Sequence, residues 1–241
     1  MVFSYLLRAL VYVLLIILGR LEVTGRENIP EAGPYIIVVN HMSITDPPIL
    51  FLAFPPMRLR FFAGEKWESH FLFGPIMKAV GAIYINRGEV DRKALREAIT
   101  AIKDGSIFGL APEGTRSRVG HLIEARDGAA YLASRTGATI LPVGVVNTNL
   151  VATNVKRLRR TTLEAHIGKP FTIPDLGHRL KGKELETATH LIMAHIANLI
   201  PERYHGYYAD SPALAALQRG DDPWPYALEA VLQKKEAEVV T

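Results

Sequence analysis

The sequence predicts an α/β domain with a largely parallel central sheet flanked by helices, together with an amino-terminal helical segment associated with a membrane. Short β-branched and aromatic runs alternate with longer segments of helical periodicity. The length of 241 residues suits one domain of this class. The first residues are almost uniformly apolar. We therefore expect an apolar membrane-associated segment at 1–20, a catalytic domain at 21–201 and a carboxyl-terminal tail at 202–241 that packs on that domain.

The amino-terminal segment is apolar without interruption from 9 to 18, between Arg8 and Arg20. A bilayer span needs about 20 apolar residues, so the run is short for a span. A secretory signal and a buried helix are the alternatives, and the sequence that starts at Gly19 is a poor cleavage site. We favour a helix in or on one leaflet, with both arginines at the headgroup level and the domain on the cytoplasmic side.

Strands are predicted by short runs rich in β-branched and aromatic residues. The run from Tyr35 to Val39 is typical of a strand buried on both faces, and it ends at Asn40 and His41. Site residues often lie at such carboxyl ends. Pro142 indicates an irregular or edge position for its strand. The other strands are expected at 59–63, 82–86, 107–111, 139–146 and 161–167.

Helices are predicted where apolar residues recur at a spacing of three to four. Asp91 is placed to cap one of them and Gly105 to end it. Asp127 is placed to cap another that ends near Gly137. The remaining helices are expected at 47–53, 67–79 and 183–199. In the tail, prolines separate short helices, and its aromatic residues are expected to pack against the domain. The prolines are Pro212, Pro223 and Pro225, and the aromatic residues are Tyr204, Tyr207, Tyr208, Trp224 and Tyr226.

Composition excludes several classes of protein. Lys and Arg number 28 against 24 Asp and Glu, giving a net charge of +4, which favours anionic partners. Nucleic acid is not expected, because basic residues cluster only at 156–160 and no recognition motif is present. The absence of cysteine excludes disulfides, a thiolate nucleophile and a cysteine zinc site. His190 and His195 are five apart on a predicted helix and do not share a face, so no metal site is expected.

His41 and Asp46 are the first candidates for chemistry. A continuous helix would turn two residues at this spacing about 140° apart, so contact between them requires a bend. With a bend, Asp46 can accept from one imidazole nitrogen while the other takes a proton from a substrate hydroxyl. The alternative is that Asp46, which precedes Pro47, only caps a helix.

The turn from Pro112 to Ser117 is the second candidate. Gly114 permits close approach of backbone N–H groups to an anion, and Arg116 supplies a fork for phosphate oxygens. Ordinary turn chemistry explains the proline and the glycine but does not require Arg116. Arg87 follows its own strand and can converge on the same anion if the two strands are neighbours.

Four blocks in this order resemble the glycerolipid acyltransferases of the lysophosphatidate acyltransferase type. The resemblance covers about 20–201. The blocks are Asn40 to Asp46, Gly81 to Arg87, Pro112 to Ser117 and Ile140 to Val143.

The resemblance implies an enzyme of phospholipid biosynthesis that moves a fatty acyl group from acyl-CoA or acyl carrier protein to the free hydroxyl of 1-acylglycerol-3-phosphate, giving phosphatidic acid. It implies a membrane surface, with anionic lipids, as a partner and no cofactor. The alternatives are the same chemistry on glycerol 3-phosphate or another lysolipid, and a non-catalytic protein that binds phospholipid headgroups. By position, His41 is the general base and Asp46 its orienting partner. The residues implied in binding the acceptor phosphate are Arg87, Glu113, Gly114, Thr115 and Arg116.

Overall fold

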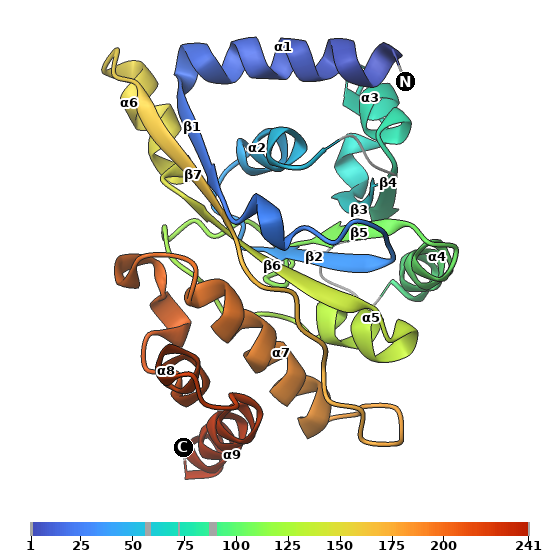
Figure 1. Cartoon of the computed structure of the whole chain (residues 1–241), viewed down its shortest axis with the longest axis vertical. Helices are drawn as coiled ribbons and strands as arrows, with labels where there is room; N and C mark the ends of the chain where they lie inside the picture. The colour runs from blue at the N-terminus through green and yellow to red at the C-terminus, as the bar shows by residue number, and fades with distance from the viewer. Residues whose placement is uncertain (1, 56–58, 72, 87–90, 241) are drawn as a thin grey trace.

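The central sheet has seven strands in the order β1-β7-β6-β2-β5-β3-β4 (Figure 1). The structure is a computed structural model that describes residues 2–55, 59–71, 73–86 and 91–240. The strands are β1 (Gly19–Thr24), β2 (Tyr35–Val39), β3 (Leu59–Gly64), β4 (Ala82–Ile85), β5 (Ile107–Leu110), β6 (Thr139–Val146) and β7 (Thr161–Ile167).

Most of the sheet is parallel, as the sequence predicts. Strands β6, β2, β5, β3 and β4 run in one direction, whereas β7 is antiparallel to β6 and β1 is parallel to β7. Of the irregular or edge position expected for Pro142, the edge position is wrong, because β6 lies between β7 and β2. Pro142 pairs with Val38 in β2, and the ladder with β7 begins only at Val143, so the missing N–H of Pro142 costs that ladder nothing.

Helices cover both faces of the sheet (Figure 1). Apolar side chains from α1 and α2 pack on one face, and those from α4, α5 and α7 pack on the other. Helices α8 and α9 pack on α7, away from the sheet. The helices are α1 (Val2–Leu18), α2 (Asp46–Ala53), α3 (Phe73–Ala79), α4 (Arg92–Lys103), α5 (Gly128–Thr136), α6 (Val151–Lys156), α7 (Lys183–Ala197), α8 (Pro212–Arg219) and α9 (Trp224–Val240).

Two expected helices differ from the structure. The helix predicted from Trp67 begins only at Phe73, because the ring nitrogen Nδ1 of His70 accepts the N–H of Phe73 at 3.2 Å and separates it from an earlier 3-10 turn. Asp127 precedes α5, as expected, but its side chain does not cap that helix. It accepts the hydroxyl of Thr189 at 2.7 Å and so joins α5 to α7.

The amino-terminal helix α1 has 17 residues. Across the described part of the chain, no helix combines the length and the apolar character needed to cross a bilayer. Leu15 of α1 is buried against the sheet side, whereas Leu6, Leu10 and Ile17 are more than half exposed. The helix therefore packs along one side and presents apolar side chains on the other.

Candidate active site

The carboxyl end of β2 carries the candidate base. Asn40, the residue after the strand, is fully buried. Its side-chain amide donates to the carbonyl of Val145 at 2.9 Å, and its side-chain oxygen accepts the N–H of Val145 at 2.8 Å. This reciprocal pair extends the β2–β6 contact by one residue, and it fixes the backbone immediately before His41.

His41 and Asp46 are in direct contact. The His41 Nδ1 lies 2.6 Å from the Asp46 Oδ2, and the same oxygen accepts the N–H groups of Met42 and Ser43, each at 2.8 Å. The loop between them therefore bends as the proposed pairing requires. Because Oδ2 accepts two backbone N–H groups, it acts as a carboxylate acceptor, and Nδ1 of His41 is the third donor.

The capping alternative for Asp46 does not hold. Thr45, not Asp46, occupies the N-cap position of α2. The other carboxylate oxygen, Oδ1, is buried and has no hydrogen-bond partner among the described residues. The Asp46 side chain therefore binds the loop that carries His41 and does not cap α2. The His41 side chain is 20% exposed and that of Asp46 only 2%, so the candidate base is accessible to solvent and its partner is not.

The turn after β5 is bonded directly to His41. Gly114 adopts φ 68° and donates its N–H to the carbonyl of Ala111 at 3.0 Å. The N–H of Ser117 donates to the carbonyl of His41 at 2.7 Å. Gly114, Thr115 and Arg116 are exposed. The structure thus brings the exposed part of the predicted anion-binding turn next to the predicted base.

Glu113 points the opposite way from its exposed neighbours and is only 2% exposed. Its Oε2 accepts the N–H of His41 at 2.7 Å and its Oε1 accepts the N–H of Ile123 at 3.0 Å. Burial raises the pKa of Glu113 to about 7, and the two N–H donors oppose part of that shift. Both carboxylate oxygens therefore bind backbone N–H groups, and one of these belongs to His41, the candidate base.

Arg126 is a basic residue of this region that the sequence analysis missed. It is exposed, its N–H donates to the carbonyl of Pro112 at 2.9 Å, and its side chain crosses Gly114. A Cβ added at Gly114 would lie 3.1 Å from the Cδ of Arg126. The sequence spacing of twelve residues gives no signal of this contact. Arg87 lies outside the described residues, so its predicted convergence on the turn stays a prediction.

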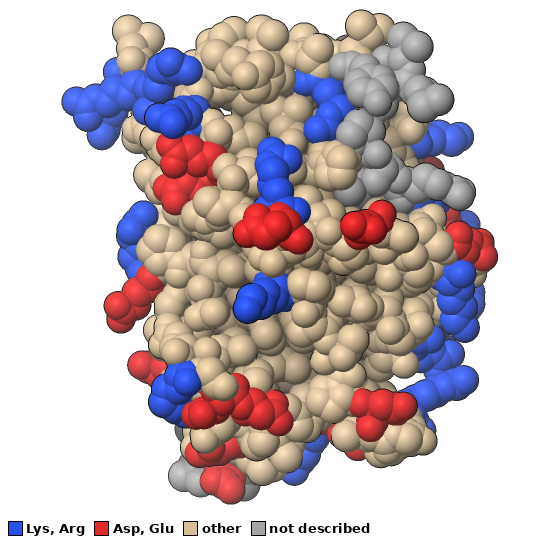
Figure 2. Space-filling view, in the orientation of Figure 1, with Lys and Arg blue, Asp and Glu red and all other residues tan. Residues whose placement is uncertain are grey.

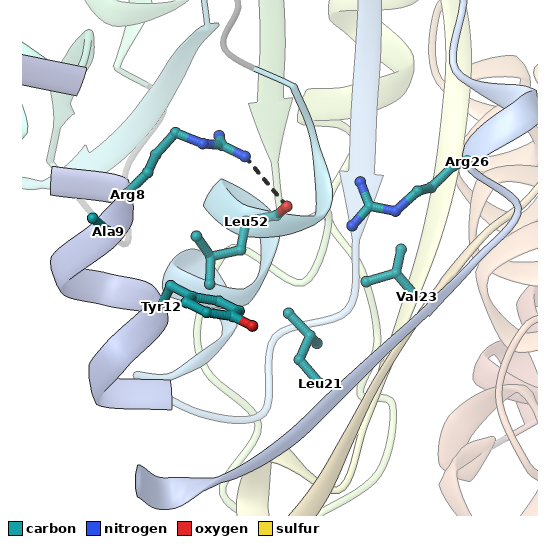
Figure 3. Close-up of a pocket in the computed structure, with 7 residues that line it drawn as sticks. All are labelled: Arg8, Ala9, Tyr12, Leu21, Val23, Arg26 and Leu52. Carbon is teal, nitrogen blue, oxygen red and sulfur yellow. Dashed lines mark hydrogen bonds between the residues drawn. The ribbon is translucent and has the colours of Figure 1, made fainter. Parts of the chain in front are cut away.

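A separate hollow of about 460 Å³ lies between α1, β1 and α2 (Figure 3). Leu52 and Tyr12 contribute to its lining, and Arg8 and Arg26 approach it from two sides. Arg8 donates to the carbonyl of Phe51, and Arg26 donates to the carbonyl at the last residue of α2, each at 2.5 Å. Both arginines thus satisfy carbonyls at the end of the helix whose first residue is the Asp46 of the candidate site.

Comparison with known proteins identifies the family. The model of the Acyltransferase family matches residues 20–146, just over half of the chain. The chain belongs to the acyltransferase family. The match includes His41, Asp46 and the turn at Pro112 to Ser117, and it confirms the resemblance found in the sequence.

Curated members of the acyltransferase family share segments with this chain. A 1-acyl-sn-glycerol-3-phosphate acyltransferase of Borreliella burgdorferi is 33% identical over 147 residues, which are 60% of this chain and 58% of that protein. The protein of the same name from Streptococcus pneumoniae is 25% identical over 205 residues, or 84% of this chain and 74% of that protein. The chain thus spans less than two thirds of the first relative and about three quarters of the second.

A solved structure of the same family shares the fold. The crystal structure of the 1-acyl-sn-glycerophosphate (LPA) acyltransferase PlsC from Thermotoga maritima aligns with a TM-score of 0.59 and 25% sequence identity. The alignment covers 70% of this chain and 68% of that chain. It confirms the predicted α/β fold with a mostly parallel central sheet.

Proposed function

We propose that this acyltransferase moves a fatty acyl group from a thioester to the free hydroxyl of 1-acylglycerol-3-phosphate, which gives phosphatidic acid. The observation that carries the proposal is the direct bonding of a His–Asp pair to an exposed turn that contains an arginine. The pair activates a hydroxyl, and the turn holds the phosphate that accompanies this hydroxyl in the acceptor. The names of the relatives in Borreliella and Streptococcus support this choice of substrate.

The reaction needs one base and no cofactor. Nε2 of His41 takes the proton of the acceptor hydroxyl as its oxygen attacks the thioester carbonyl. The tetrahedral intermediate then expels the thiolate, which takes the same proton from the imidazolium. Asp46 keeps the proton on Nδ1 and stabilises the imidazolium between the two steps. The acyl group passes directly to the acceptor, so no protein nucleophile is required.

The exposed residues of the turn are proposed to bind the acceptor phosphate. Thr115 offers a backbone N–H group and Arg116 a bidentate guanidinium, while Gly114, whose own N–H donates to Ala111, permits close approach of the anion. Arg87 is proposed to join them. For Glu113, which the family resemblance places among these residues, burial and two backbone bonds favour a role in positioning His41 over direct contact with phosphate.

We also propose that α1 rests on a membrane surface. Its exposed side chains from Leu6 to Ile17 are mostly large and apolar. In Figure 2 this helix is largely free of charge, and Lys and Arg gather beside it over the end of α6 and the start of β7. An apolar face flanked by basic residues suits an anionic lipid surface. This placement would give the domain access to a lipid acceptor from the cytoplasmic side.

The substrate is tested by a panel of acceptors and donors. The purified chain in detergent is offered lysophosphatidate, glycerol 3-phosphate and lysophosphatidylcholine, each with acyl-CoA and with acyl carrier protein, and products are identified by mass. We expect phosphatidic acid from lysophosphatidate and little product from the other acceptors. Product mainly from glycerol 3-phosphate would assign the chain to that acceptor instead. No product from any pair would favour a headgroup-binding protein.

A further inference from the structure

The segment 204–208 lies beyond the part of the chain that the family model matches, yet it bonds to the segment that follows the active-site turn. The N–H of Leu122 donates to the carbonyl of Tyr204 at 2.8 Å, and the N–H of Tyr207 donates back to the carbonyl of Leu122 at 3.1 Å. The N–H of Ala125 donates to the phenol oxygen of Tyr208 at 3.1 Å. Three bonds therefore hold 122–125 from one side.

The contact is close as well as hydrogen-bonded. Gly206 adopts φ 49°, and a Cβ added there would lie 2.1 Å from the Nδ1 of His121 and 2.4 Å from the carbonyl oxygen of Leu122. Tyr208 is 2% exposed and Leu122 is fully buried. Because only glycine fits between the two segments, a shift of one displaces the other.

On its other side, the same segment holds Glu113. The N–H of Ile123, the residue after Leu122, donates to Glu113 Oε1 at 3.0 Å, and the N–H of His41 donates to Oε2 of the same carboxylate at 2.7 Å. The position of a buried carboxylate depends strongly on its hydrogen-bond donors, because bulk water cannot reach the interior to replace a donor that is lost. Tyr208 thus bonds to one end of segment 122–125, at Ala125, and Ile123 in the same segment bonds to Glu113, which in turn bonds to the backbone of His41.

We propose that segment 204–208 is a positioning element of the active site, which fixes the backbone of His41 through segment 122–125 and Glu113. The inference rests on the proposed function only in that acyl transfer serves as one readout. It assigns segment 204–208 an indirect role in catalysis, exerted through segment 122–125 and Glu113. Tyr208 and Gly206 are positioning residues in this account.

Tyr208→Phe tests the proposal with Tyr207→Phe as its matched control. The first removes the phenol oxygen that accepts the Ala125 N–H. The second keeps the backbone bond of Tyr207 to Leu122 and removes only the hydroxyl of this half-exposed residue, which donates to Glu124 at 3.2 Å. We expect kcat to fall about tenfold in Tyr208→Phe, the effect of one buried hydrogen bond. The KM for both substrates should stay within about twofold. Tyr207→Phe should match the parent. Equal kcat in the two variants would overturn the proposal.

A double-mutant cycle separates positioning from general destabilisation. If Tyr208 acts through Glu113, Tyr208→Phe has little further effect on kcat once Glu113→Gln is present. Effects that multiply would show independent action and contradict the proposal.

Hydrogen exchange provides a readout that does not depend on the substrate. In Tyr208→Phe, peptides that contain Ile123 and His41 should exchange faster than in the parent and in Tyr207→Phe, while peptides from β3 and β4 are unchanged. Unchanged protection at Ile123 and His41 would overturn the coupling. If the parent transfers no acyl group to lysophosphatidate, the proposed function fails and this measurement still decides the coupling.

A second pair of variants, at two glycines, tests the proposal if Tyr208→Phe does not fold. Gly206→Ala places a methyl group against His121 and Leu122, whereas Gly220→Ala has a similar left-handed φ of 82° and nothing within 4 Å. Both carry backbone strain, so the difference between them measures the displacement of the segment. We expect lower kcat and faster exchange at Ile123 in Gly206→Ala alone. The same behaviour in both variants would contradict the proposal.

Discussion

Asp46→Asn separates the charge of the Asp46 side chain from its hydrogen bonds. The His41 Nδ1 and the N–H groups of Met42 and Ser43 all meet Oδ2, at 2.6, 2.8 and 2.8 Å. An asparagine can place its carbonyl oxygen at that point, so the bonds and the His41 tautomer persist and the negative charge is lost. A hydrogen bond to a charged group contributes ~1.5–3 kcal/mol against ~0.5–1.5 for a neutral one. The loss of about 1–2 kcal/mol should lower kcat about 5- to 30-fold.

The other carboxylate oxygen of Asp46 leads us to expect a separate effect of Asp46→Asn on stability. The Asp46 Oδ1 is buried and has no hydrogen-bond partner among the described residues. The asparagine amide would occupy this position and leave its donors unsatisfied, which costs roughly 1–3 kcal/mol in the free energy of unfolding. Asp46→Ala removes the acceptor of all three donors, so its kcat should fall at least about tenfold below that of Asp46→Asn.

The assay is the initial rate of phosphatidate formation at saturating substrates, with urea unfolding of each variant. Asp222→Asn is the control, because Asp222 accepts the N–H of Trp224 at 3.0 Å, is exposed and has no histidine partner within the described part of the chain. It should retain the parental kcat. A parental kcat in Asp46→Asn, or equal kcat in Asp46→Asn and Asp46→Ala, would contradict the role of the Asp46 charge.

Three further predictions concern the turn, pH and the membrane. Arg116→Ala should raise the KM for lysophosphatidate about tenfold and leave the KM for the thioester unchanged; equal changes in both would point to a structural role. Burial lowers the pKa of His195 to about 4, so the unfolded chain binds the proton more readily and stability is lost as pH falls from about 6.5 toward 4. His195→Phe can keep the stack on Phe171. Between pH 7 and pH 5, its free energy of unfolding in urea should therefore fall by about 2 kcal/mol less than that of the parent. An equal fall in the two proteins would contradict this. Ile17→Glu should weaken binding to anionic vesicles roughly tenfold in flotation, whereas Leu228→Glu on α9 should not; equal binding by both would remove α1 from the interface.

The parts of the fold with strong local patterns were predictable. The continuous apolar run of β2 indicated burial on both faces, and every residue of β2 is buried. Asp91 caps α4 by accepting the N–H groups of Lys93 and Ala94, as its position before a helical pattern indicated. The spacing of His41 and Asp46 indicated that contact between them would require a bend, and the contact and the bend are both present in the structure.

Other features depend on contacts between distant segments. Strand β1 directly follows the apolar run of α1 and is set by pairing with β7, so no local pattern separates it from the helix. Helix α9 extends over 17 residues despite Pro225, because proline is tolerated in the first helical turn. The direction of Glu113 could not be predicted, since a turn sequence allows a solvated carboxylate equally well. Only its partners, Ile123 and the backbone of His41, explain its burial.

The role of His41 as the general base is tested by comparing the parent with His41→Ala. Both are incubated with lysophosphatidate and an acyl thioester, and phosphatidate is quantified by mass alongside binding of lysophosphatidate. We expect product from the parent, a rate about 10²- to 10⁴-fold lower in His41→Ala, and similar binding of lysophosphatidate by both. Phosphatidate formation by His41→Ala within a few-fold of the parent would contradict the role of His41 as the base.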